Sequence, residues 1–138
     1  MGVAQLEKIE EYIDMRRKNN SLYQEYLKNV KGITFQPQKR NVKNIYWVNA
    51  ATIDKEVFGI DRNTLMAKLG RVGIQTRKFF VPMHKQPALQ KYITNNKESF
   101  PISLSLSENG LYLPSGSGLE ANEIEYICEV IREIHKKC

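Results

Sequence analysis

The stretch GIQTRKFFVPMHKQP, residues 73–87, gathers side chains that can bind an anionic or polar ligand. Arg77 carries a planar guanidinium, which can give paired charge-assisted hydrogen bonds to phosphate, and the imidazole of His84 can donate a hydrogen bond to a phosphate or hydroxyl. Phe79 and Phe80 alternate faces in a strand, so at least one is expected in the core. The stretch suggests a strand that leads into a binding loop. A solvated cation and a surface histidine are the plainer interpretations of Arg77 and His84.

Weaker signals for chemistry occur near the end of the chain. The loop LPSGSG lacks the lysine and spacing of a phosphate-binding P-loop, and it precedes Glu120, whose charge would repel an anion at the start of a helix. Cys128 and Cys138 fall in one predicted helix about 15 Å apart, which is too far for a disulfide. No metal-ligand spacing is present in the sequence, so no metal site is predicted.

Several other polar and aromatic residues admit structural interpretations. Tyr46 and Trp47 lie in the apolar run NIYWVNAATI and are expected in the core, although both could stack on a ligand. Arg16 and Arg17 could pair with a neighbouring subunit or form the solvated face of a helix. His135 is expected at the surface near the carboxyl end of the last helix, where its charge suits the helix dipole.

The apolar periodicity and the turn residues place these side chains on an alternating series of elements. These patterns predict one long helix over 3–30, a linker after Gly32, a helix capped by Asp61 and ended by Gly73, and a final helix from about Glu120. A short helix is expected near Pro101, and strands are expected over 44–53, 74–80 and 110–115. The fold class is therefore α/β, with a small sheet covered by helices.

Composition is that of a soluble globular domain, with 41% hydrophobic and 26% charged residues. The middle of the chain is basic, with nine basic and four acidic residues over 45–100, whereas three basic and six acidic residues occupy 101–138. This distribution favours an anionic partner near the middle segment. No apolar run approaches the roughly 20 residues of a membrane span, and a cytoplasmic location without a membrane partner is expected.

Three stretches in the same order carry a resemblance to a known family: GVAQLEKIEEYIDMRR, GIQTRKFFVPMHKQP and GLYLPSGSGLEANEIEYICEVIREI. Together they resemble the C-terminal part of the DegT/DnrJ/StrS family of pyridoxal-phosphate-dependent nucleotide-sugar aminotransferases, which includes perosamine synthetase. The resemblance implies the small C-terminal domain of a fold-type-I aminotransferase. Residues 1–32 would be its leading helix and residues 33–138 an α/β sandwich, with the large cofactor-binding domain absent.

The resemblance also implies the activity of the parent enzyme. In the family, pyridoxal phosphate carries an amino group, usually from glutamate, to a keto group of a nucleotide-linked deoxysugar, and the enzymes are homodimers. The family's Ser-Phe-His stretch with its nearby cofactor lysine does not occur here. No catalytic or cofactor-binding residue is therefore expected in the chain, and the chain alone is expected to be inactive.

Within the matching segment, the resemblance gives substrate-binding roles to three residues. Arg77 would hold the diphosphate, His84 would donate to a phosphate or sugar hydroxyl, and Phe80 or Phe79 would shape the sugar pocket. Two other function classes compete with this hypothesis. One is a stand-alone interaction or dimerisation domain built on the first helix, and the other is weak nonspecific nucleic-acid binding by a chain of pI near 9.3. No nucleic-acid-binding motif is present, so nucleic acid is not the expected partner.

Overall fold

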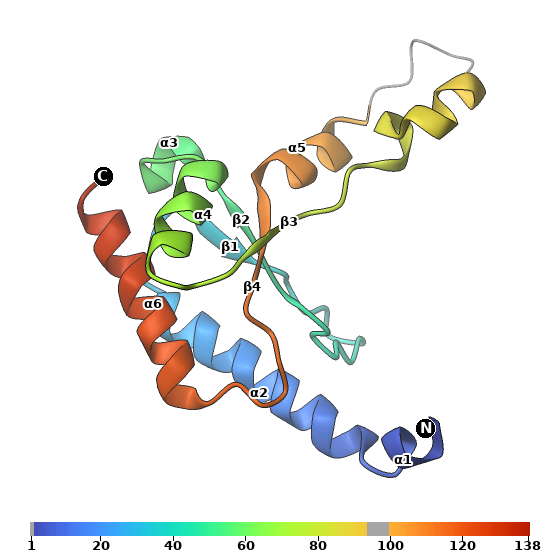
Figure 1. Ribbon diagram of the computed structural model, residues 1–138, viewed down its shortest axis with the longest axis vertical. Helices are drawn as coiled ribbons and strands as arrows, with labels where there is room; N and C mark the ends of the chain where they lie inside the picture. The colour runs from blue at the N-terminus through green and yellow to red at the C-terminus, as the bar shows by residue number, and fades with distance from the viewer. Residues whose placement is uncertain (1, 94–99) are drawn as a thin grey trace.

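A computed structural model describes residues 2–93 and 100–138, which form a four-stranded antiparallel sheet with helices packed on it (Figure 1). The helices are α1 (Gly2–Leu6), α2 (Ile9–Leu27), α3 (Lys55–Phe58), α4 (Arg62–Arg71), α5 (Pro101–Asn109) and α6 (Ala121–Lys136), with two 3₁₀ helices, η1 (Met83–Lys85) and η2 (Pro87–Tyr92). The strands are β1 (Ile33–Phe35), β2 (Asn49–Ile53), β3 (Arg77–Lys78) and β4 (Gly110–Leu113). Among the described helices, none is long and apolar enough to cross a bilayer.

The strand order is β1-β2-β4-β3, so the last strand in the sequence lies between β2 and β3. Its register places Leu113 opposite Asn49 on one side and Tyr112 opposite Arg77 on the other. Side chains alternate faces along a strand, and Leu111 and Leu113 point into the core. Tyr112 therefore points to the opposite face of the sheet. The α/β fold class with a small sheet covered by helices is confirmed.

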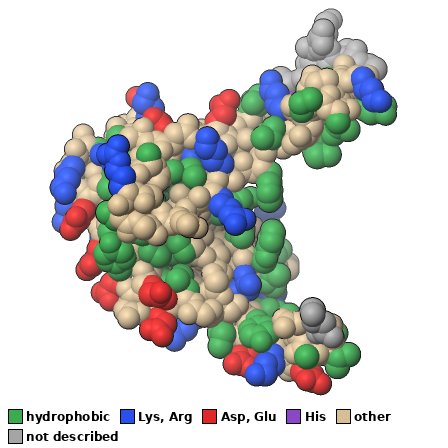
Figure 2. Space-filling model, in the orientation of Figure 1, with side chains coloured by type: hydrophobic (Ala, Val, Ile, Leu, Met, Phe, Trp, Pro, Cys, Tyr) green, Lys and Arg blue, Asp and Glu red, His purple; other side chains and the backbone are tan. Residues whose placement is uncertain are grey.

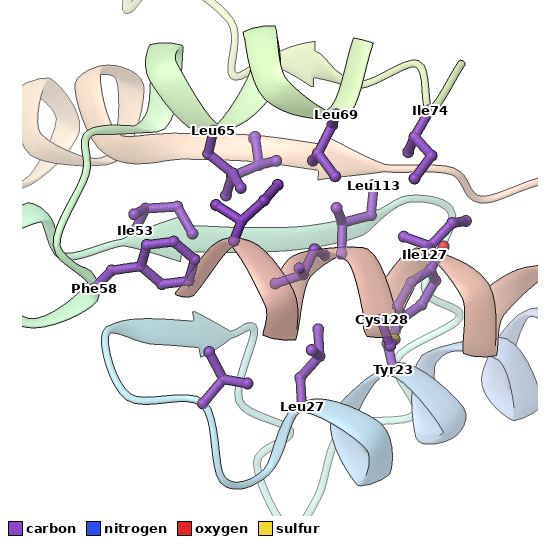
Figure 3. Close-up of a cluster of buried hydrophobic side chains, with 14 of the residues drawn as sticks. Tyr23, Leu27, Ile53, Phe58, Leu65, Leu69, Ile74, Leu113, Ile127 and Cys128 are labelled. Atoms are coloured by element: carbon purple, nitrogen blue, oxygen red, sulfur yellow. The ribbon is translucent and has the colours of Figure 1, made fainter. Parts of the chain in front are cut away.

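The core lies between the sheet and helices α2, α4 and α6 (Figure 3). Helix α6 contacts both α2 and α4, and its buried residues repeat at helical spacing: Ile124, Ile127, Cys128, Ile131 and Ile134. Tyr23 and Leu27 of α2 join this cluster with Leu65 and Leu69 of α4. The second half of α2 is therefore part of the same core as the sheet, because its apolar side chains are buried against α6.

Capping residues explain where the helices begin and end, and they confirm the boundaries predicted from sequence. The Asp61 carboxylate accepts hydrogen bonds from the backbone N–H of Thr64 at 2.9 Å and from its hydroxyl at 3.0 Å, which lowers the pKa of Asp61. Glu120 forms a capping box with Glu123 at the start of α6. Pro101 begins α5, and Gly73, with φ 81°, follows α4.

The predicted single helix over 3–30 is interrupted. Two helices occur, α1 and α2, and they are separated at Glu7 and Lys8. No Gly or Pro marks this break in the sequence, so the apolar pattern alone could not locate it.

The expected strand over 44–53 begins only at Asn49. The carboxamide oxygen of Asn44 accepts the backbone N–H of Tyr46 at 3.0 Å, and Tyr46 has a positive φ of 45°. This turn keeps Tyr46 and Trp47 out of the strand, although aromatic residues favour strands. Tyr46 is buried as predicted, but the predicted burial of Trp47 is wrong, because 64% of its surface is exposed.

Between β3 and α5 the chain leaves the sheet. The expected strand over 74–80 contains only two paired residues, Arg77 and Lys78. Residues 79–93, which we call the arm, project away from the sheet and carry η1 and η2 (Figure 1). Its exposed apolar side chains are Phe80, Val81, Met83 and Tyr92.

Candidate functional site

A hollow of about 360 Å³ lies along β3 and β4 and the segment that precedes β2, and we call it the sheet hollow. Its lining includes Arg77, Lys78 and Phe80, together with Tyr112 and Trp47. The molecular outline is also concave between the arm and the N-terminal helices, and hydrophobic and basic side chains gather along this concave side (Figure 2). The structure thus brings two of the three predicted site residues, Arg77 and Phe80, to one surface.

The sheet register explains why Arg77 faces this hollow. Arg77 is paired with Tyr112, and directly opposed residues of an antiparallel pair point to the same face. Tyr112 faces away from the core, so Arg77 does too. The Tyr112 ring is packed by Phe79, with ring centroids 4.6 Å apart, and by Phe80 at 5.9 Å. Phe79 is half-buried and Phe80 is 74% exposed, but both rings pack on Tyr112 on the face away from the core, so the expectation that at least one of them lies in the core is wrong.

The charge around the sheet hollow is one-sided. Arg77 faces the hollow and Lys78 follows it in β3, pointing to the other face of the strand, so both add positive charge near the hollow, and no Asp or Glu is among the residues that line it. Burial raises the pKa of the Tyr112 hydroxyl, so this residue is a neutral hydrogen-bonding group at physiological pH. The remaining lining comes from apolar side chains and small polar residues such as Thr76 and Ser115. Such a surface suits a ligand that has an anionic group and an apolar part.

Side chains of α2 hold the loops that form one wall of the hollow. The Arg16 guanidinium donates to the carbonyl oxygens of Trp47 at 2.6 Å and Ser115 at 3.4 Å. Asn19, which is buried, donates to the Gly116 carbonyl at 3.1 Å. Arg17 donates to the Asn44 carbonyl at 2.6 Å. The polar middle of α2 is therefore a docked surface. Of the two interpretations of Arg16 and Arg17, the solvated face is wrong, because both donate to main-chain oxygens far along the sequence, and pairing with a neighbouring subunit stays a prediction.

A second set of buried amides extends this support beneath the wall. Asn20 donates to the side-chain oxygen of Asn49 at 3.1 Å, and the Asn49 backbone N–H donates to the Ser115 hydroxyl at 2.7 Å. The Tyr23 hydroxyl donates to the Pro114 carbonyl at 3.1 Å. Buried polar groups that are satisfied in this way fix one arrangement of the chain. The wall of the hollow is thus rigidly positioned from behind.

His84 lies outside the sheet hollow, on η1 in the arm. Its ring stacks on Phe100 with centroids 4.7 Å apart, and its carbonyl accepts a hydrogen bond from Gln90 at 2.7 Å. The structure therefore separates His84 from Arg77 and Phe80. A role in substrate binding stays a prediction for all three residues.

Arg62 is a polar residue that sequence reasoning did not single out. It is buried in α4 and donates to the carbonyl oxygens of Gly110 at 2.8 Å and Ser107 at 3.3 Å. Burial lowers the pKa of its guanidinium, which remains charged at physiological pH. The cation thus satisfies carbonyls at the end of α5 and holds β4 next to α4. A charged residue directly after the Asp61 cap was the available signal, but its long-range partners are not visible in the sequence.

The remaining candidates are structural. His135 is half-buried, its Nδ1 lies 3.1 Å from the Phe58 carbonyl and its ring packs on Phe58, so the expected surface position is wrong. Cys128 is buried, Cys138 is exposed, and both are free thiols. Within residues 2–93 and 100–138, no three His, Cys, Asp or Glu side chains are grouped so that they could hold a metal ion.

Comparison with known proteins gives this geometry a family. A model of the DegT/DnrJ/EryC1/StrS aminotransferase family matches residues 1–132. The chain belongs to this family. Over 134 residues it is 33% identical to GDP-perosamine synthase of Vibrio cholerae. The matched region covers 96% of this chain and 35% of that relative. Over 137 residues it is 31% identical to GDP-perosamine synthase of Escherichia coli O157:H7. The matched region covers 98% of this chain and 35% of that relative.

Solved structures of family members share the fold. DesI, determined in the presence of its TDP-sugar product, superposes with a TM-score of 0.86 at 26% identity, over 99% of this chain and 34% of DesI. The chain therefore spans about a third of the length of the relatives that it matches.

The family is pyridoxal-phosphate-dependent, and the residues described here can be tested against that cofactor. Its pyridinium nitrogen needs a carboxylate or comparable partner, and its aldehyde needs a lysine placed to form a Schiff base. The sheet hollow offers no carboxylate, and its one lysine, Lys78, is exposed on an edge strand. The hollow does not fit the cofactor by itself, whereas its two cations and its aromatic rings fit a phosphorylated ligand.

Proposed function

We propose that this chain is the substrate-facing C-terminal portion of a pyridoxal-phosphate-dependent aminotransferase that acts on a nucleotide-linked keto-deoxysugar. The family match over residues 1–132 carries this proposal. Relatives named as GDP-perosamine synthases and a solved relative described with a TDP-sugar product support a nucleotide sugar as substrate. The amino donor would be glutamate, the enzyme would be a cytoplasmic homodimer, and the cofactor would be bound by parts of the protein outside residues 1–138.

The sheet hollow supplies what the chain itself would do. Arg77 would donate paired hydrogen bonds to the diphosphate, and the neighbouring Lys78 would add to the positive potential. Phe80, exposed beside Tyr112, would pack against the apolar face of the deoxysugar. His84, whose Nε2 is buried without a partner among the described residues, would donate to a phosphate or hydroxyl once the arm meets the ligand. These residues bind and orient the substrate, and none of them is proposed to take part in the chemical step.

The isolated chain is expected to be inactive, because its hollow lacks both a carboxylate and a sequestered lysine for the cofactor. Two proteins separate this proposal from the stand-alone interaction domain. One is the 138-residue chain, and the other is the longest protein that the gene encodes. Each is incubated with pyridoxal phosphate, glutamate and a GDP-linked keto-deoxysugar, and amino-sugar product is measured. The proposal requires product from the longer protein only. Turnover by the 138-residue chain, or none by either protein, would refute it.

A substitution then tests the role of Arg77 in the longer protein. Arg77→Gln should raise KM for the nucleotide sugar by roughly 10- to 150-fold, because a hydrogen bond from a charged group contributes about 1.5–3 kcal/mol. The matched control is Lys136→Gln, which removes an exposed cation in the last turn of α6 and should leave KM unchanged. Equal KM values for the two variants would contradict the anion-binding role.

A further inference from the structure

Trp47 is the single tryptophan of the chain, and it is presented to solvent by a fixed main chain. Its side chain is 64% exposed and lines the sheet hollow. Arg16 holds its carbonyl oxygen at 2.6 Å, and the turn at Asn44 and Tyr46 sets the direction of the preceding residues. Placing a large aromatic ring in water forfeits the free energy of burying it. A rigid backbone that keeps such a ring exposed at the wall of a hollow suggests that a ligand covers it.

The opposite wall of the same hollow is positively charged. Trp47 precedes β2, whereas Arg77 and Lys78 form β3, and β4 lies between these two strands. Two strand spacings separate β2 from β3 by roughly 10 Å, and Trp47 lies just before the first residue of β2. A ligand that fills the hollow therefore meets the Trp47 indole at one end and the Arg77 guanidinium at the other, with the charge of Lys78 nearby. The volume of the sheet hollow, about 360 Å³, falls within the range of small-molecule pockets, roughly 300–1,000 Å³.

These features select among ligand chemistries. A free anion uses the cations but not the indole, and an apolar ligand leaves the cations without partners. A nucleoside diphosphate has a flat aromatic base at one end and phosphates at the other, so it can use the indole and the cation together. The absence of acidic residues from the lining agrees with an anionic ligand of this kind. Phe80 lies on the cationic side, following β3, so it is less suited to the distant base.

We propose that Trp47 is the stacking platform for the nucleobase of the nucleotide sugar. This inference rests on the proposed function for the diphosphate end of the ligand and adds the site for the base. Stacking on an aromatic side chain tolerates every base, because each base has a π-face. Trp47 would therefore supply affinity for the nucleotide without selecting guanine or thymine. Removing the indole should weaken nucleoside diphosphate binding by roughly 5- to 150-fold, the range for one stacked base.

A binding experiment on the 138-residue chain tests the stacking directly. The protein is titrated with GDP, with dTDP and with inorganic pyrophosphate, while calorimetry measures binding and tryptophan fluorescence reports on Trp47 alone. Both nucleotides should quench the fluorescence, and pyrophosphate should bind more weakly and quench less. N-Acetyltryptophanamide, titrated in parallel, corrects for absorption of light by the nucleotides.

Two variants complete the test. Trp47→Ala should lose 5- to 150-fold in affinity for both nucleotides and keep its affinity for pyrophosphate, whereas Trp47→Phe should keep most of the nucleotide affinity. The control is Tyr126→Ala, which removes another half-exposed aromatic ring away from the sheet hollow. Circular dichroism and thermal unfolding show whether each variant is folded.

The outcomes separate this inference from the proposed function. Selective loss of nucleotide affinity in Trp47→Ala supports the platform. If Trp47→Ala binds GDP as well as the unmodified protein does, and Arg77→Gln still abolishes pyrophosphate binding, the platform is wrong and the diphosphate site stands. If the unmodified chain binds neither nucleotide nor pyrophosphate, both the platform and the diphosphate site in this chain are wrong.

Discussion

Gly110 is the position where one added methyl group should disturb the fold most informatively. It begins β4, and a Cβ built there would overlap the ring of Phe79 and lie 2.5 Å from the carbonyl oxygen of Leu106. The backbone of Gly110 is ordinary extended chain, with φ −86° and ψ 141°, so an alanine would meet no conformational strain. The effect of Gly110→Ala therefore comes from steric overlap alone.

The surroundings of Gly110 leave little room for relaxation. Its carbonyl oxygen accepts hydrogen bonds from Arg62 at 2.8 Å and from the backbone N–H of Phe79 at 3.2 Å. Phe79 in turn stacks on Tyr112. Moving the backbone weakens the two hydrogen bonds, and moving the Phe79 ring breaks the stack. Overpacking of this kind lowers the free energy of unfolding by roughly 1–3 kcal/mol.

Thermal unfolding converts this value into a measurable shift. An unfolding entropy of about 2.1 cal/mol/K per residue gives roughly 0.3 kcal/mol/K for a chain of this length. Gly110→Ala should thus lower Tm by roughly 3–10 °C. The matched control is Gly70→Ala in α4, where a Cβ meets no atom within 4 Å. Alanine favours the helix over glycine by up to about 1 kcal/mol, so this variant should raise Tm by up to about 3 °C. A Gly110→Ala protein as stable as the unmodified chain would refute the steric reasoning.

Two further predictions concern buried polar groups. Arg62→Met keeps the unbranched stem of the side chain but leaves the Gly110 and Ser107 carbonyls without their donor, so the free energy of unfolding in urea should fall by roughly 1–3 kcal/mol; an unchanged midpoint would show that these bonds contribute nothing. Burial raises the pKa of the Cys128 thiol from 9.0 to about 12, so between these pH values the folded protein keeps a proton that the unfolded chain releases. Stability should therefore fall as pH rises above 9, by about 1 kcal/mol at pH 10 from this group. In urea unfolding at pH 7 to 11, Cys128→Ala should lose stability less steeply than the unmodified chain; parallel curves would assign the loss elsewhere.

The local features of the fold could be predicted from the sequence because each depends on a few neighbouring residues. Asp61 and Glu120 mark helix starts by their own side-chain chemistry, Pro101 suits the first helical turn, and Gly73 allows a positive φ. At this level the predictions were correct, since nothing distant competes with the local signal.

The predictions that were wrong concern features that depend on partners far along the chain. The polar middle of α2 looked solvated because its acceptors are main-chain oxygens of residues 44, 47, 115 and 116, which no side-chain pattern reveals. Trp47 looked buried because aromatic and β-branched neighbours favour a strand, whereas the turn at Tyr46 exposes it. At the candidate site, Arg77 and Phe80 were predicted to act together and do share the sheet hollow. The path of the arm, which carries His84 elsewhere, was not predictable from residue types.

The attachment of α2 to the hollow through main-chain oxygens has a consequence for how the site can diverge. Arg16, Asn19 and Arg17 hold carbonyl groups, which every amino acid possesses. Side chains at 47 and 116 can therefore be exchanged during evolution while the supporting hydrogen bonds persist, whereas Asn44 and Ser115 also make hydrogen bonds with their side chains. Mutations that alter ligand preference are in this way uncoupled from mutations that undo the scaffold. Substitutions in the wall of the hollow can therefore change which ligand is bound, while the hydrogen bonds from α2 to the main chain keep the domain stable.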